Sequence, residues 1–103
     1  MPYGLKPETL ERLNQVFKKH EQIDEVILYG SRAKGNYTEG SDIDLTLQGK
    51  DLDNRALQKI RIEIDDLLLP WIVDLSILSN IDNEELIAHI DRVGKIIYKK
   101  TDT

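Results

Sequence analysis

The sequence predicts a small α/β (α+β) domain built on a mixed β-sheet of three to four strands, with helices packed on one face. Two patterns lead to this fold class. Short apolar runs bounded by glycine, proline and polar residues are typical of strands, and longer stretches with apolar residues at every third or fourth position are typical of helices. The patterns alternate along 103 residues, the length of one domain, so we expect residues 1–103 to fold as a single unit.

The first half of the chain is expected to form two helices and two strands. Pro7 suits the first turn of a helix, which Lys18, Lys19 and His20 close with favourable charge at its C-terminal end. The apolar stripe of this helix consists of Leu10, Leu13, Val16 and Phe17. The next elements are a strand over about 24–29, a short helix after Gly30-Ser31, a polar loop over 36–41 and a strand over about 42–48.

A second long helix is expected after Gly49. Asp51 or Asp53 can cap it, and Pro70 ends it after about Leu69. Its buried side is expected to hold Leu57, Ile60, Ile64, Leu67 and Leu68. Ile62 lies off this stripe, which indicates a second contact surface, for self-association or for a partner.

The last third of the chain is expected to contain a strand, a helix and a short extended segment. The strand covers about 71–78, and Asp82 with Glu85 three residues later resembles a helix cap. The inward residues of this final helix are expected to be Leu86, Ile87, Ile90 and Val93. Gly94 is placed where a left-handed residue ends a helix, and a short fourth strand is expected over 95–99.

The composition narrows the class of protein. A hydrophobic content of 40% and a charged content of 32% are typical of a globular protein in water, and no apolar stretch approaches the roughly 20 residues needed to span a bilayer. Without cysteines or a signal-peptide core, a cytoplasmic location is expected. The net charge of −5 and the scattered basic residues argue against an extended nucleic-acid surface.

A glycine turn follows the first strand and has the chemistry of a phosphate site. Gly30 permits a tight turn and a close approach of the backbone to a ligand. If a helix begins there, its free N–H groups point at a bound anion, and Ser31 adds a hydroxyl. Arg32 and Lys34 supply positive charge suited to a triphosphate. These four residues are the candidate nucleotide-binding residues.

Three aspartates are the candidate catalytic and metal-binding residues. Asp42 and Asp44 project from one face of a strand, with Cα atoms roughly 7 Å apart. Two like charges so close favour a bound cation, and Mg²⁺ binds through carboxylates and substrate phosphates. Asp74 is the only charge in a stretch that reads as a buried strand, so it needs a partner, and a metal shared with Asp42 and Asp44 would supply one if the strands are neighbours.

The ordered set of Gly30-Ser31, Asp42-x-Asp44 and Asp74 resembles the signature of the DNA polymerase β-like nucleotidyltransferase superfamily. The strings Gly-Ser-Arg-Ala-Lys-Gly and Ser-Asp-Ile-Asp-Leu are closely similar to minimal nucleotidyltransferase (MNT) domains. The resemblance implies that Ser31, its adjacent backbone and Arg32 hold the triphosphate and that the three aspartates bind Mg²⁺, with two ions expected. It also implies pairing with an all-helical HEPN toxin, which an MNT antitoxin neutralises by adding AMP to a tyrosine.

We therefore expect Mg²⁺-dependent transfer of a nucleotide, with ATP as donor and a hydroxyl on a protein or RNA as acceptor. Asp74 is expected to act as a metal ligand and, as an alternative or in addition, as general base. Three other functions stay open: inhibition of a HEPN-type partner by docking alone, transfer to a small molecule as in aminoglycoside nucleotidyltransferases, and nucleotide sensing without turnover. A chain this short has no room for a lid, so substrate is expected to enter between this chain and a partner.

Overall fold

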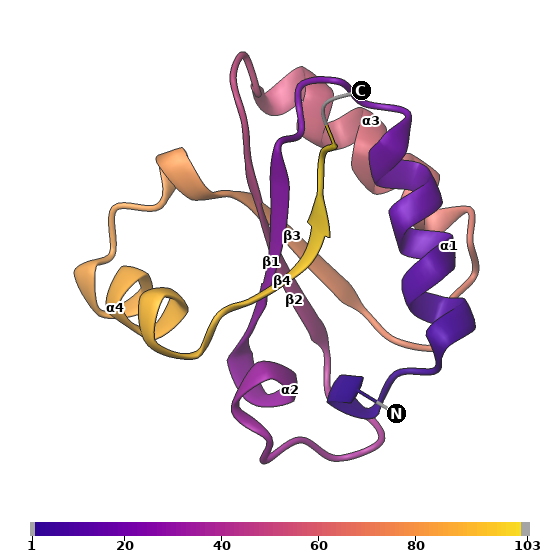
Figure 1. Cartoon of the computed structure of the whole chain (residues 1–103), viewed down its shortest axis with the longest axis vertical. Coiled ribbons are helices and arrows are strands. Elements are labelled where there is room, and N and C mark those ends of the chain that lie inside the picture. Colours follow the sequence, from indigo (N-terminus) through magenta and orange to yellow (C-terminus); the bar gives the residue numbers. More distant parts are fainter. Residues whose placement is uncertain (1, 102–103) are drawn as a thin grey trace.

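The computed structural model describes residues 2–101 and contains one four-stranded sheet in the order β3-β2-β1-β4 (Figure 1). Its strands are β1 (Glu25–Tyr29), β2 (Ile43–Gln48), β3 (Val73–Ile77) and β4 (Lys95–Lys99). β1 pairs antiparallel with β2 and β4, while β2 pairs parallel with β3. The sheet is therefore mixed, and the predicted fold class and the short fourth strand are confirmed.

The expected helices are all present. They are α1 (Pro7–Lys18), α2 (Gly30–Lys34), α3 (Asn54–Asp65) and α4 (Glu84–Val93), with short 3₁₀ turns η1 (Pro2–Gly4) and η2 (Leu78–Asn80). Within residues 2–101, no helix combines the length and the apolarity that a membrane crossing requires. The parallel β2–β3 pair is joined through α3, the crossover that parallel strands need.

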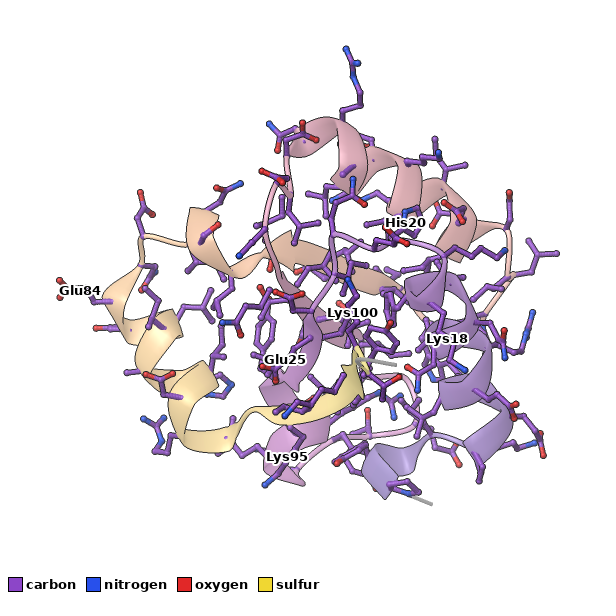
Figure 2. The ribbon with its side chains drawn as sticks, turned by 45° about the horizontal axis from the view of Figure 1, so that its top comes forward. Lys18, His20, Glu25, Glu84, Lys95 and Lys100 are labelled. Carbon is purple, nitrogen blue, oxygen red and sulfur yellow. The ribbon has the colours of Figure 1, made fainter. Side chains whose placement is uncertain are left out.

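The main core lies between the sheet and the two long helices, which cover the same face (Figure 1). β2 contributes Ile43, Leu45 and Leu47, and the facing side chains of α1 include Leu13 and Phe17; all five are fully buried. His20 lies just beyond the end of α1 (Figure 2). Its Nε2 bonds to a carboxylate oxygen of Glu63 on α3 at 2.8 Å. This contact joins the C-terminal end of α1 to α3.

The helix α4 differs from the expected arrangement because it lies on the other face of the sheet (Figure 1). Its residue His89 contacts the ring of Tyr29, whose side chain points away from the main core. Gly94, expected to be left-handed, has φ −57° instead. A Cβ there would meet Ile90 O and lie 2.8 Å from Ile27 Cγ2, so the glycine serves the close approach of α4 to β1.

Two helix ends also differ from the sequence expectation. α3 ends at Asp65 rather than Leu69, because the chain turns there and Leu68 adopts φ 55° with 86% of its surface exposed. The cap of α4 is Asn83 rather than Asp82: the Asn83 side chain accepts a hydrogen bond from Leu86 N at 3.1 Å. Asp53 caps α3 as one of the two expected alternatives, accepting from Ala56 N at 2.9 Å.

Candidate nucleotide and metal site

The sheet brings two of the predicted aspartates side by side. β2 and β3 pair with Asp44 directly opposite Asp74, and β1 and β2 pair with Tyr29 opposite Asp44. Neighbouring residues in register project to the same face, so both carboxylates and the phenol share the face opposite the main core. The expectation that the two acid-bearing strands are neighbours is confirmed.

Like charges gather around Asp44. Burial of its half-buried carboxyl raises the pKa of Asp44, and the negative charges of Asp74 and Asp42 raise it further. Burial likewise raises the pKa of Tyr29; Asp74 and Asp44 add to the rise, while a hydrogen bond with Ser76 opposes it. This part of the face is therefore a place where a cation would relieve repulsion.

Asp74 is exposed, in contrast to the buried setting that its sequence neighbours suggest. Only one side of β3 is buried, through Leu75 and Ile77, while Asp74 and Ser76 alternate with them on the other face. β3 is also an edge strand, so no other strand among residues 2–101 pairs with its outer side. The strand is half-buried rather than enclosed, and Asp74 is open to an approaching molecule.

The glycine turn lies directly against the acids. Gly30 has φ 74°, a left-handed conformation that favours glycine, and a Cβ there would collide with Asp44 Oδ2. α2 begins at Gly30 as expected, with Ser31 half-buried in its first turn and Lys34 exposed at its end. The backbone of the turn and the Asp44 carboxylate are therefore in contact across β1 and β2.

Arg32 occupies a setting that the sequence did not reveal. Only 1% of its surface is exposed, and its guanidinium donates to three backbone carbonyls. The bonds run from Nε to Ser41 O at 3.0 Å, from Nη1 to Tyr3 O at 3.0 Å and from Nη2 to Glu39 O at 3.1 Å. All three nitrogens are thus engaged by the protein, which favours a positioning role for the loop that leads to Asp42 over direct contact with a triphosphate.

Two aromatic rings complete the environment of Arg32. Its guanidinium carbon lies 5.4 Å from the ring centre of Tyr37 and 5.2 Å from that of Trp71, within the range of a cation–π contact. Trp71 also donates from Nε1 to Glu39 O at 2.7 Å. In the sequence, Tyr37 and Trp71 lie on either side of Asp42 and Asp44. Only the fold brings these two aromatic rings together around Arg32.

His89 is a residue at the site that sequence reasoning missed. Its Nε2 accepts a hydrogen bond from Gly30 N at 3.0 Å, and its ring meets that of Tyr29 edge-on with centres 6.3 Å apart. A histidine on an amphipathic helix carries no local signal for such a contact. Only the position of α4 across the sheet brings it to the glycine turn.

The aspartates offer the right donor atoms for magnesium. Hard divalent cations take oxygen ligands, and the crowding of charge at Asp44 is the condition that a bound cation would relieve. As their side chains stand, no three His, Cys, Asp or Glu groups within residues 2–101 close around a point that could hold an ion. The carboxylate oxygens of Asp42, Asp44 and Asp74 therefore suit a divalent metal, although the three side chains do not converge on one point.

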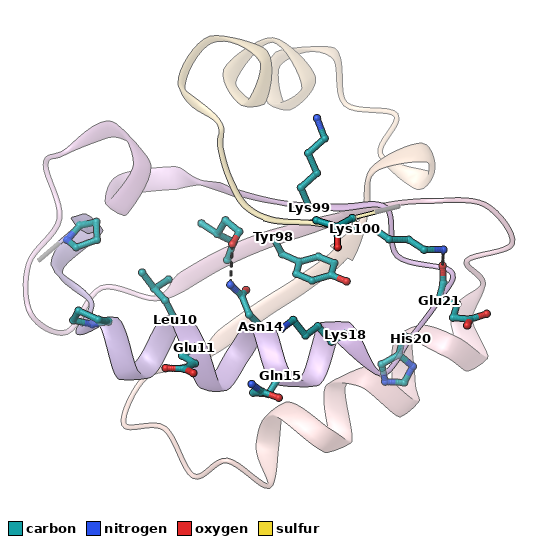
Figure 3. Close-up of a pocket in the computed structure, with 14 residues that line it drawn as sticks. Leu10, Glu11, Asn14, Gln15, Lys18, His20, Glu21, Tyr98, Lys99 and Lys100 are labelled. Carbon is teal, nitrogen blue, oxygen red and sulfur yellow. Dashed lines mark hydrogen bonds between the residues drawn. The ribbon is translucent and has the colours of Figure 1, made fainter. Parts of the chain in front are cut away.

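A groove lies elsewhere, between α1 and β4 (Figure 3). Its volume is about 1010 Å³, and its walls include Asn14, Lys18, Tyr98 and Lys100. Neither the glycine turn nor any of the three aspartates lines it. Size alone would favour this groove, but the grouping of ionisable and phosphate-binding chemistry favours the acidic face as the functional site.

A glycine turn pressed against an aspartate, with a second aspartate in register on the next strand, is the arrangement of the nucleotidyltransferase class. The family model described as "Polymerase beta, Nucleotidyltransferase" matches residues 11–103, and the chain belongs to this family. No curated protein matches the chain in sequence.

Several solved structures share the fold. A toxin–antitoxin structure with AMP-PNP is similar with a TM-score of 0.72 and 22% identity, over 89% of this chain and 74% of that one. An MNT antitoxin complex with the tri-AMPylated HEPN toxin of Shewanella oneidensis gives 0.62 and 22%, over 89% and 73%. A putative nucleotidyltransferase from Sulfolobus solfataricus gives 0.53 and 21%, over 88% and 77%. At these identities the likeness shows the fold.

Proposed function

We propose that this protein transfers a nucleoside monophosphate, AMP from ATP, to a hydroxyl of a partner protein with the aid of Mg²⁺. The observation that carries the proposal is the register of β2 and β3, which sets Asp44 beside Asp74 while Gly30 lies against Asp44. The relatives of the same fold support the donor and the acceptor class, because one structure holds AMP-PNP and another an AMPylated HEPN toxin. The partner is then an all-helical HEPN toxin, and this chain its antitoxin.

Each residue has a proposed task in this reaction. Ser31 and the α2 amides that follow Gly30 hold the triphosphate, with Lys34 adding positive charge at the other end of that short helix. Asp42, Asp44 and Asp74 would hold Mg²⁺, which supplies charge neutralisation for the triphosphate and the leaving group. Arg32 keeps the loop before Asp42 in place through its bonds to Glu39 O and Ser41 O.

The bond changes follow from the donor. The acceptor oxygen bonds to the α-phosphorus, the bond from that phosphorus to the bridging oxygen breaks, and pyrophosphate leaves. The hydroxyl proton passes to Asp74 or to water; Asp74 suits the first route because it is exposed at the edge of the sheet, where an acceptor can approach. Because this edge of the sheet is open, a second chain can bring the acceptor hydroxyl to the site.

Label transfer tests the proposal. With Mg²⁺ and proteins and RNA of the source cell, α-labelled ATP is expected to label a protein band, whereas γ-labelled ATP labels none because the γ-phosphate leaves in pyrophosphate. Asp42→Asn is expected to abolish labelling, and Asp51→Asn, which removes a carboxylate from an exposed loop, to preserve it. Labelling by the γ-phosphate, or labelling that survives Asp42→Asn, would contradict nucleotide transfer by this site.

Inhibition of the partner by docking alone is the second candidate, and one observation favours it. Ile62, on α3, and Leu68 and Ile72, between α3 and β3, are large apolar residues that are 60%, 86% and 71% exposed, the kind of surface that a docked partner would cover. In this case Asp42→Asn leaves neutralisation of the toxin intact, while Leu68→Asp weakens it. Under the preferred proposal, the single substitution Asp42→Asn is sufficient to abolish neutralisation of the toxin.

A further inference from the structure

The amide of Gly30 is held by a side chain from a distant part of the sequence. Gly30 is the first residue of α2, and the amides in the first turn of a helix have no partner within the helix. His89, on α4, accepts the hydrogen bond of this amide through Nε2 at 3.0 Å. The contact joins the glycine turn to a helix that begins more than fifty residues later in the chain.

The chemistry of this bond defines the state of the imidazole. A backbone N–H can only donate, so Nε2 must be unprotonated and the ring proton must lie on Nδ1. The edge-on contact with Tyr29, at an angle of 79° between the rings, fixes the orientation of the imidazole. His89 is therefore oriented as an acceptor for one specific amide.

The position of α4 is itself well determined. Ile90, the next residue, is buried, and Gly94 allows the end of the helix to approach Ile27 of β1. His89 is thus presented from a packed element rather than from a loop. Its acceptor atom has little freedom to leave Gly30 while α4 stays packed.

The turn is held from both sides as a result. His89 bonds the Gly30 amide, and Asp44 Oδ2 lies so near that a Cβ on Gly30 would collide with it. A shift of the turn away from His89 loses the hydrogen bond, and a shift toward Asp44 meets the carboxylate. Ser31 follows Gly30 directly, so the same two contacts fix the start of the segment proposed to hold the triphosphate.

We propose that His89 is a positioning residue for nucleotide binding, acting through the Gly30 amide and not through contact with the nucleotide. The proposal rests on the proposed function and deepens it, because it makes α4 a part of the nucleotide site. The property required at position 89 is a neutral hydrogen-bond acceptor that reaches Gly30 N. Glutamine can supply one, whereas leucine of similar size cannot.

Binding of AMP-PNP with Mg²⁺ to the full chain, measured by calorimetry, tests this. His89→Leu is expected to bind about 3- to 10-fold more weakly than wild type, the effect of one lost hydrogen bond, and His89→Gln to stay within about threefold. Ala88→Leu, the neighbouring exposed position on the same helix, is the matched control and is expected to bind like wild type. In ¹⁵N spectra the Gly30 amide is expected to exchange faster in His89→Leu than in wild type or His89→Gln.

The outcomes separate this inference from the proposed function. Equal affinity of wild type and His89→Leu overturns the inference and leaves the proposed function intact, whereas tighter binding by His89→Leu shows a competitor for the amide and also overturns it. Absence of binding by all forms, wild type included, overturns the proposed function together with the inference. If His89→Leu does not fold, His89→Gln and the shorter His89→Asn carry the test: equal affinities of these two overturn the inference.

Discussion

The two faces of the sheet use the same strands with different chemistry. On one face, Leu28, Leu45 and Leu47 are fully buried beneath α1 and α3. On the other, the carboxyl of Asp44 faces that of Asp74 with a raised pKa, and the hydroxyl of Thr46 is buried without a hydrogen-bond partner among the described residues. The first face removes apolar surface from water, and the second retains groups whose burial costs free energy.

This difference indicates where stability and function reside. Burial of apolar surface contributes about 25 cal/mol per Å², so the face beneath the long helices stabilises the fold. Repelling carboxylates and an unpaired hydroxyl persist only where the rest of the structure compensates, which is typical of functional sites. Substitutions on the two faces should therefore change stability in opposite directions.

The largest expected effect is on the apolar face. Leu45→Ala should lower the free energy of unfolding by about 2 to 5 kcal/mol, because it removes buried methyl groups and leaves a cavity between the sheet and the helices. Urea unfolding measures the change. Ile62→Ala, at an exposed position of α3, is the control and should change stability by about 0.5 kcal/mol or less. Equal effects of the two variants would contradict the assignment of the core to this face.

A smaller loss is expected at the boundary between the faces. Arg32→Met should cost about 2 to 3 kcal/mol, because the carbonyls of Tyr3, Glu39 and Ser41 lose their donor. Thermal unfolding measures this, with Lys34→Met as the control, since Lys34 is an exposed cation on the same short helix. An Arg32→Met variant as stable as wild type but deficient in AMP-PNP binding would show that Arg32 contacts the nucleotide directly.

The sequence predicted the secondary-structure elements well, but it predicted few of the contacts between them. Apolar spacing predicted the strands and the long helices because one buried face dictates the period of each element. The alternation of Val73, Leu75 and Ile77 also contained the information that β3 is half-buried, although the apolar character of the stretch suggested enclosure. Local chemistry thus predicted the type of element better than its exposure.

Contacts between distant residues explain what the sequence did not predict. Arg32 carries the charge expected of a phosphate ligand, but Tyr37, Trp71 and three carbonyls surround it only in the folded chain. His89 reaches Gly30 because α4 crosses the face that was expected to be open. The pairing of Asp44 with Asp74 was predicted only on the condition that their strands are neighbours, which the register of the sheet supplies.

The smallest expected effect has the opposite sign and lies on the acidic face. The pKa of Asp44 is raised above the ordinary value of 3.8, so folding disfavours its charged form. The Asp44 carboxyl contributes its full stabilisation below pH 3.8, where it is protonated. This contribution is lost as the pH rises through the raised pKa of the folded state. Asp44→Asn, which stays neutral, should therefore be more stable than wild type at pH 7 and lose this advantage as the pH falls through the raised pKa toward 3.8.

The gain should be modest and sensitive to magnesium. Asp44 is half-buried, so water screens the repulsion and the gain should stay below about 1 kcal/mol, a few degrees in Tm. Millimolar Mg²⁺ should raise the Tm of wild type and leave that of Asp44→Asn almost unchanged, because a cation relieves a repulsion that only wild type has. Glu11→Gln, an exposed carboxylate on α1, controls for net charge. An Asp44→Asn variant that is less stable at pH 7 than wild type without Mg²⁺ would mean that the carboxylate is held by favourable contacts, and the contrast between the two faces would then fail.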